Sequence, residues 1–297
     1  MQAGISIVIP TYNYAGFIRE SIDSVLPQMA DDDELIVVDD GSSDDTRARL
    51  EVYIGQEKIR YVYQENAGVG AARNKGVSLA SRQYLYFIDA DDRLLPGGLD
   101  RLRQKMAACP DCAMVFAAHE SVAENGNCRV HHQKTISENC QKNFIDYVIG
   151  RRFSIANGGV ALVRRDVMLQ YPYPESIRVS EDFCVYAWVL ANHVCAAFDT
   201  VIVRVRKHEA SLRNQLSHYE AAVEKLPDIL FDAEKLPQPL LGYKRRFRCN
   251  RLLSLFRAQY LAGEFSKARH TYRAAIVCRP SNLFRLSYLR KYLRTFL

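Results

Sequence analysis

The start of the chain alternates short apolar runs with segments of helical periodicity. The apolar runs cover residues 5–10, 34–38, 59–64 and 84–88, while helical segments cover 15–26 and 70–80 and begin near 43. A short apolar run between polar turns is typical of a buried strand, and apolar residues three or four positions apart are typical of a helix. Strands that alternate with helices pair in parallel. The pattern therefore predicts an α/β fold with a mainly parallel central sheet flanked by helices.

The second half of the chain is less regular. We expect helices over 99–108 and 183–191, strands over 114–118, 158–163 and 201–205, and a hairpin or loop over 119–140. Helices are expected to fill the remainder. The sequence therefore predicts an α/β domain over residues 1–215 and a basic helical C-terminal region over residues 216–297.

Polar residues follow the predicted strands of the first half, at positions 11–13, 39–40, 65–66 and 89–92. The carboxyl ends of parallel strands meet at one edge of a sheet, where ligands bind. We therefore expect these polar residues to line one cleft.

Three carboxylates crowd into the last of these positions, in Asp89, Asp91 and Asp92. Like charges this close raise each other's pKa unless a cation lies among them. A hard divalent cation with oxygen ligands would relieve the repulsion, and Mg²⁺ is usually held by one or two carboxylates plus substrate phosphates. The same residues also fit a helix cap followed by a solvated acidic turn, so the triplet alone decides nothing.

Five motifs occur in order: "SIVIPTYN" (6–13), "VVDDGSSDDT" (37–46), "QENAGVGAARNKG" (64–76), "FIDADDRLLP" (87–96) and "SED" (180–182). Together they resemble the family 2 glycosyltransferases of bacterial surface-polysaccharide type, over roughly residues 4–215. The resemblance implies the A-type glycosyltransferase fold, which binds a nucleotide-sugar.

The resemblance assigns the nucleotide base to the exits of the first two strands. Pro10 and Tyr12 match the segment that flanks the base, and Asp40 matches the residue that accepts a hydrogen bond from uracil. A carboxylate can accept from an imide N–H, and Tyr12 can pack on the base. Asp39 is expected to be a turn residue before Gly41.

The glycine-rich motif at 64–76 supplies small residues where a backbone must approach a ligand. Gly70 begins a helix whose free N–H groups favour anions, and Arg73 can pair with a phosphate or with an aspartate of the cleft. A helix packed closely on the sheet through Ala71, Ala72 and Gly76 would explain the same motif, and both interpretations can hold.

The metal-binding residues implied by the resemblance are Asp89 and Asp91, with Asp89 also placed to touch the ribose. The expected cofactor is Mn²⁺ or Mg²⁺, which stabilises the nucleotide diphosphate as it leaves. His208 resembles a histidine that follows the last sheet strand in many family members and can ligate the metal. Its alternative role is that of an ordinary loop histidine or an acceptor contact.

The resemblance makes Asp182 the catalytic base, because an inverting transfer needs a carboxylate to take the proton of the attacking hydroxyl. Glu181, Gly158 and Gly159 match positions that frame the donor sugar and the acceptor. Without the other motifs, Glu181 and Asp182 would be interpreted as an acidic first helical turn stabilised by the helix dipole.

The end of the chain is strongly basic. Residues 243–297 hold fourteen Lys or Arg and one acid, a net charge of +13, whereas the preceding residues carry −7. Residues 252–280 resemble one tetratricopeptide-like helical hairpin. Cations among aromatic and aliphatic residues in the final helix, at 282–297, fit an anionic membrane surface. A docked helix with solvated arginines is the alternative, and the absence of a known module argues against nucleic acid.

The eight cysteines are expected to form no disulfide framework, because no export signal precedes the first strand. Cys109 and Cys112, with Cys128, Cys140 and the histidine pair at 131–132, could form a zinc site. The favoured interpretation is that Cys109 ends a helix and Cys112 opens a strand. With no apolar run of membrane-spanning length, we expect a cytoplasmic protein, attached peripherally to the inner face of the membrane.

These features together predict an inverting, metal-dependent glycosyltransferase. It would move a sugar from a nucleotide-diphosphate donor, for which we expect a UDP-sugar, to a glycan or lipid-linked acceptor. A phosphatase with an Asp-x-Asp motif is one alternative. Such an enzyme needs its two aspartates after the first strand, whereas in this sequence they follow the fourth predicted strand. A non-catalytic nucleotide-binding or helical scaffold protein is the second alternative.

Overall fold

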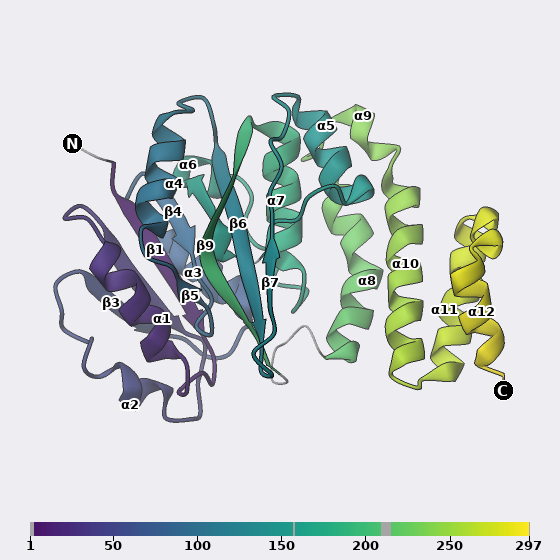
Figure 1. Cartoon of the computed structure of the whole chain (residues 1–297), viewed down its shortest axis with the longest axis horizontal. Coiled ribbons are helices and arrows are strands. Elements are labelled where there is room, and N and C mark those ends of the chain that lie inside the picture. Colours follow the sequence, from purple (N-terminus) through teal and green to yellow (C-terminus); the bar gives the residue numbers. More distant parts are fainter. Residues whose placement is uncertain (1–2, 157, 209–214, 297) are drawn as a thin grey trace.

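The computed structural model describes residues 3–156, 158–208 and 215–296. Its strands form one sheet in the order β3-β2-β1-β4-β8-β6-β9-β5, with β7 paired to β6 (Figure 1). The strands are β1 (Ile5–Thr11), β2 (Glu34–Asp39), β3 (Ile59–Tyr63), β4 (Tyr84–Phe87), β5 (Arg93–Leu94), β6 (Met114–Ala123), β7 (Cys128–His131), β8 (Ala161–Arg164) and β9 (Cys195–Lys207).

Helices cover the sheet and continue beyond it. Those of the α/β part are α1 (Ile18–Val25), α2 (Thr46–Leu50), α3 (Val69–Leu79), α4 (Gly98–Ala107), α5 (Cys140–Ile145), α6 (Arg165–Met168) and α7 (Glu181–Asn192). The C-terminal helices are α8 (Leu216–Leu230), α9 (Gln238–Leu241), α10 (Lys244–Leu261), α11 (Phe265–Cys278) and α12 (Leu286–Arg294). A π-helical turn, Asp146–Gly150, follows α5.

The first four predicted strands pair in parallel, as expected: β1 lies between β2 and β4, and β3 flanks β2. The second half of the sheet is mixed. Strand β8 is antiparallel to both β4 and β6, whereas β6 and β9 are parallel. The predicted strand over 158–163 begins later than expected, because Gly158–Val160 forms a 3-10 turn before β8.

The predicted hairpin after residue 118 is present as the antiparallel pair β6 and β7. Strand β6 is longer than predicted, because it pairs along its whole length with β9 and extends past the apolar residues.

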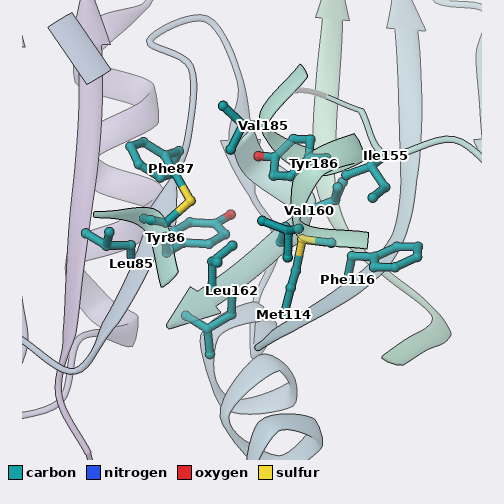
Figure 2. Packing of buried hydrophobic residues seen from close by; sticks show 14 of the residues in the cluster. Leu85, Tyr86, Phe87, Met114, Phe116, Ile155, Val160, Leu162, Val185 and Tyr186 are labelled. Atoms are coloured by element: carbon teal, nitrogen blue, oxygen red, sulfur yellow. The ribbon is translucent and has the colours of Figure 1, made fainter. Parts of the chain in front are cut away.

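The core forms where the two halves of the sheet meet the central helix α7. Figure 2 shows side chains of β4, β6, β8 and α7 packed together there, among them Tyr86, Phe116, Leu162 and Tyr186. On the first half, α3 lies so close to β1 that a Cβ added at Gly76 would stand 2.3 Å from Cγ1 of Val8. The close helix packing expected from the glycine-rich motif is therefore confirmed.

The C-terminal helices lie at the end of the molecule opposite β3 (Figure 1). Helix α10 joins the main core through Phe247, whose ring stacks on Phe183 of α7 at a centroid distance of 5.9 Å. A second, smaller core holds α10, α11 and α12 together; it consists of Leu253, Phe256, Ala268, Tyr272 and Ala275. The main hydrophobic core continues into α8 and the start of α10, so no separate core marks a boundary at residue 215. The predicted division into two domains at this residue stays a prediction.

The cysteines differ from expectation in one place. Cys249 of α10 and Cys278 of α11 form a disulfide across the helical hairpin, with their Cα atoms 5.8 Å apart. Sequence separation could not reveal this pair, since it depends on which faces of two antiparallel helices meet. Cys109 follows α4 and Cys112 precedes β6, as the favoured interpretation predicted.

No helix in the described part of the chain is long and apolar enough to cross a membrane.

Candidate active site

The exits of β1, β2 and β4 lie side by side, because these strands are parallel neighbours. Pro10 is buried in β1, and Tyr12, directly after it, is 44% exposed. Asp40 follows β2, and Asp89 follows β4. The polar strand exits therefore meet along one edge of the sheet, as predicted.

Asp40 organises the glycine-rich loop that leads into α3. Its carboxylate accepts hydrogen bonds from Nε2 of Gln64 at 2.8 Å and from the backbone N–H groups of Ala67 at 2.9 Å and Gly68 at 2.8 Å. The residue is only 2% exposed. This role in positioning the loop was not foreseen, and a contact with uracil stays a prediction.

Asp39 is the turn residue that the sequence indicated. Its carboxylate accepts from the backbone N–H of Ser42 at 2.9 Å and from the Tyr61 hydroxyl at 2.9 Å. It thereby fixes the turn that follows β2.

Arg73 links two parts of the chain that are far apart in sequence. Its guanidinium contacts Asp89 at 2.7 Å and also forms a short ion pair with Glu181, while the Tyr173 ring lies 5.4 Å from the guanidinium carbon. The side chain is only 3% exposed. The sequence allowed Arg73 to pair with a phosphate or with an aspartate of the cleft. The structure shows the pair with Asp89, together with a second pair to Glu181. Gly70 lies one turn earlier, where an added Cβ would be 3.2 Å from the carbonyl oxygen of Pro174.

The acidic cluster after β4 is compact. Asp89, Asp91 and Asp92 each place a carboxylate oxygen within 4.8 Å of the others. In the described part of the chain, no other set of acidic, cysteine or histidine side chains converges in this way, the cysteines proposed for zinc included. Asp92 is buried and accepts from the backbone N–H of Arg206 at 3.0 Å, so it ties the cluster to β9.

His208 lies beside the cluster, with Nε2 at 2.8 Å from Oδ2 of Asp91. Burial and the charge of Asp89 raise the pKa of Asp91, and the bond to His208 acts in the opposite direction. Three converging carboxylates are an oxygen donor set that fits Mg²⁺ or Mn²⁺. The acidic cluster therefore fits the expected metal, whereas ligation by Asp89, Asp91 and His208 stays a prediction.

Two aromatic residues at this site were missed by the sequence analysis. Phe17 stacks on the His208 ring at 5.1 Å, and Tyr14 meets it edge-on at 5.9 Å. The guanidinium of Arg206 also lies over the Phe17 ring, 4.9 Å from its centroid. Phe17 belongs to the segment 15–26, which the sequence predicts to be an amphipathic helix. No local pattern distinguishes a ring that packs on an imidazole from one that packs in a hydrophobic core.

Glu181 and Asp182 form the first turn of α7, after Ser180, whose φ of 65° turns the chain into the helix. Burial raises the pKa of Glu181 to about 7, against the opposing effect of Arg73. Burial also raises the pKa of Asp182, whose carboxylate accepts the backbone N–H of Phe183 at 2.7 Å. A carboxylate with a raised pKa is a stronger base, so the turn is equipped for proton transfer.

The glycines predicted to frame the donor sugar lie in the 3-10 turn Gly158–Val160. The carbonyl oxygen of Gly159 accepts from the buried Tyr86 hydroxyl at 2.9 Å, and a Cβ at Gly159 would meet Val203 of β9 at 3.1 Å. The turn is therefore held between β4 and β9, whereas its contact with a sugar stays a prediction.

The fold is the A-type nucleotide-sugar-binding fold that the motifs implied. A structure of S. aureus TarS 1–349 in complex with UDP superimposes with a TM-score of 0.67 at 17% identity, covering 98% of this chain and 88% of that chain. The UDP-GlcNAc complex of the same protein gives a TM-score of 0.61 at 18% identity, covering 98% and 90%.

The sequence comparisons identify the family. The model of glycosyl transferase family 2 matches residues 6–171, which is more than half of the chain, and the protein belongs to this family. The putative teichuronic acid biosynthesis glycosyltransferase TuaG of Bacillus subtilis is 36% identical over 124 residues, which cover 41% of this chain and 49% of the relative. The chondroitin synthase of Escherichia coli is 33% identical over 124 residues, covering 41% and 18%.

An uncharacterized glycosyltransferase of Rickettsia felis matches over a longer stretch, at 26% identity across 205 residues. That match covers 68% of this chain but only 33% of the relative, so the chain spans about a third of that protein's length. The family model and the fold therefore agree in placing the chain among the family 2 glycosyl transferases.

Proposed function

We propose that this chain acts as a glycosyltransferase, that the transfer is metal-dependent and inverting, and that its donor is a UDP-sugar. The observation that carries the proposal is the arrangement of the acidic groups: Arg73 joins the cluster at Asp89 to the α7 turn that bears Asp182. A site that must bind a diphosphate and activate a hydroxyl needs both groups within one cleft. The TarS structures with UDP and UDP-GlcNAc support the choice of donor.

The proposed roles follow from position. Pro10, Tyr12 and Asp40 border the base, while Gly70 and Arg73 lie at the start of α3. A divalent cation held by Asp89, Asp91 and His208 would neutralise the diphosphate as the sugar bond breaks. Asp89 also lies close enough to the strand exits to contact the ribose.

The reaction requires a base for the acceptor hydroxyl, and Asp182 fills this role. Its oxygen takes the hydroxyl proton as the acceptor oxygen attacks the anomeric carbon, and the bond to the diphosphate breaks on the opposite face. Arg73 holds Glu181 beside Asp182, so that one carboxylate of the turn is neutralised and the other remains available. Gly158 and Gly159 would leave room for the donor sugar.

We further propose that the acceptor is a growing glycan or a lipid-linked glycan of a surface polysaccharide, in line with the names of TuaG and chondroitin synthase. The C-terminal helices support a membrane-bound acceptor. A patch of exposed apolar side chains lies there among exposed arginines: Leu283, Phe284, Leu286, Leu293 and Phe296, with Arg285, Arg290 and Arg294. Apolar groups that insert among lipid chains, surrounded by cations, are typical of an anionic interface.

Donor turnover tests the proposed reaction. The purified protein is incubated with Mn²⁺ or Mg²⁺ and with UDP-, GDP- and dTDP-sugars, and the released nucleotide is measured. We expect metal-dependent hydrolysis of a UDP-sugar and its loss in Asp182→Asn, which keeps the shape of the side chain. Asp199→Asn is the matched control, because that carboxylate pairs with His132 at the surface. Equal turnover in wild type and Asp182→Asn would exclude Asp182 as the base.

Vesicle flotation tests the membrane patch. We expect binding to phosphatidylglycerol vesicles and not to phosphatidylcholine vesicles, with loss of binding in the double variant Phe284→Ser and Leu286→Ser. Leu169→Ser serves as a control, since this exposed leucine follows α6, away from the C-terminal helices. Flotation that is unchanged in the double variant would contradict the proposed surface.

A further inference from the structure

Two arginines gather beside the helix that carries Asp182. The guanidinium carbon of Arg251, in α10, lies 4.4 Å from the ring centroid of Phe183 and 5.0 Å from that of Phe247. Phe183 directly follows Asp182 in α7. Arg151 approaches the same stretch of α10, since its Nη2 donates to the Ser254 hydroxyl at 3.1 Å, three residues beyond Arg251.

Neither arginine has an acidic partner among the residues that the structure describes. Among the ion pairs of the described residues none includes Arg151 or Arg251, although their neighbour Arg152 pairs with Asp146 at 3.2 Å. Burial lowers the pKa of Arg251; the Tyr219 hydroxyl, which hydrogen-bonds to it, acts in the opposite direction, and the positive charge of Arg151 lowers this pKa further. Two cations that weaken each other cost free energy in a folded protein unless an anion lies between them.

The backbone at Arg151 is unusual as well. This residue follows the π-helical turn Asp146–Gly150 and has a φ of 50°, a left-handed conformation that is unfavourable for residues other than glycine. A glycine would relieve the strain. Arg151 therefore has an unfavourable backbone conformation and, among the described residues, no acidic partner, while its side chain contacts the stretch of α10 that carries Arg251.

The arginine pair is separated from Asp182 by one layer of aromatic side chains. The Tyr147 ring stacks on Phe183 at a centroid distance of 4.9 Å. Burial and the negative charge of Asp182 raise the pKa of Tyr147, and Arg251 acts against them. The Tyr147 hydroxyl is thus within electrostatic reach of both the proposed base and Arg251, so the arginine pair lies near the turn that bears Asp182.

We propose that Arg151 and Arg251 form a subsite for an anionic group of the acceptor, a phosphate or a carboxylate carried close to the hydroxyl that reacts. The inference rests on the proposed function, in which the donor diphosphate is bound at the acidic cluster across Arg73. The fork of guanidinium donors matches both anions, which can bind in a bidentate manner. Arg151 is exposed and Arg251 partly so, which leaves the pair open to a ligand.

Calorimetric titration with two small anions tests the subsite. Glycerol 3-phosphate and glucuronate are titrated separately, at constant ionic strength, into the full chain saturated with UDP and Mg²⁺. We expect wild type to bind at least one of them, the stronger ligand indicating whether the acceptor group is a phosphate or a carboxylate. Arg151→Gln and Arg251→Gln should each weaken this binding at least tenfold, and Arg152→Gln should leave it unchanged.

The design separates the possible failures. Arg251 packs on two aromatic rings, so Arg251→Gln can lose stability, whereas Arg151 is exposed and its variant keeps the test decisive. A wild-type protein that binds UDP but neither anion would overturn the subsite, as would anion binding that Arg151→Gln leaves intact. A wild-type protein that binds no UDP would instead refute the proposed donor.

Discussion

Removing the cation of Arg73 should destabilise the protein in a pH-dependent manner. In Arg73→Met, Glu181 and Asp89, whose side chains are 6% and 20% exposed, lose their shared partner. Breaking a buried ion pair costs about 3–5 kcal/mol, and because Asp89 is partly screened by water we expect about 3 kcal/mol near pH 8.

The pH dependence follows from Glu181, whose pKa is raised from 4.5 to about 7. The stabilisation contributed by its protonated form is fully present below 4.5 and is lost as the pH rises through the folded-state pKa. In wild type this loss is complete near pH 7. Arg73 lowers this pKa, so without it the pKa of Glu181 rises further and the loss extends to higher pH. Each pKa unit of that rise corresponds to about 1.4 kcal/mol, so the penalty should be larger at pH 8 than at pH 5.5.

Urea denaturation measures both quantities, with the fluorescence of Trp188, the single tryptophan, as the signal. Arg93→Met is the matched control, because Arg93 and its partner Glu20 are 50% and 44% exposed, and it should cost under about 1 kcal/mol. A penalty for Arg73→Met that is no larger than the control, or one that is the same at both pH values, would refute the reasoning.

Three further changes test other parts of the structure. Gly76→Ala forces a methyl group against Val8 and should destabilise the protein by about 1–2 kcal/mol in urea titrations, whereas Gly242→Ala, which meets nothing within 4 Å, should not. Asp40→Ala leaves the buried N–H groups of the glycine-rich loop without their acceptor; it should cost about 1–3 kcal/mol and weaken UDP binding, and an unchanged affinity would count against the loop's role. Cys249→Ser opens a disulfide with a sequence separation of 29 and should lower the stability of the α10–α11 hairpin by about 3–4 kcal/mol, seen as faster hydrogen exchange in α11.

Much of the first half of the fold was predictable, because its signals are local. The apolar runs, the turns after them and the glycine-rich motif each occupy a few neighbouring residues, and parallel pairing then brings their ends to one edge. Asp39 as a turn residue and Gly76 as a packing contact followed from the same reasoning. The strand over 114–118 was predicted too short, since its outer part is held by pairing with β9 and not by apolar residues.

The contacts between distant segments could not be predicted from residue patterns. Arg73 and Glu181 are 108 positions apart, and nothing in either motif says that they meet. The antiparallel insertion of β8 between β4 and β6 likewise depends on how the chain crosses the sheet. Arg151 and Arg251 are likewise far apart in sequence, and the contact of Arg151 with Ser254 of α10 brings them together.

The short pairing of β5 with β9 has a consequence for how this chain can change in evolution. Arg93 pairs with Arg204 and Leu94 with Val203, and beyond this short ladder Asp92 contacts Arg206 and Asp91 contacts His208. A strand advances by about 3.3 Å per residue. Deleting or inserting two residues between Arg204 and His208 would therefore move the imidazole by about 6.6 Å, well beyond its 2.8 Å contact with Asp91. Substitutions on the outer face of this strand are tolerable, but a change in its length is not.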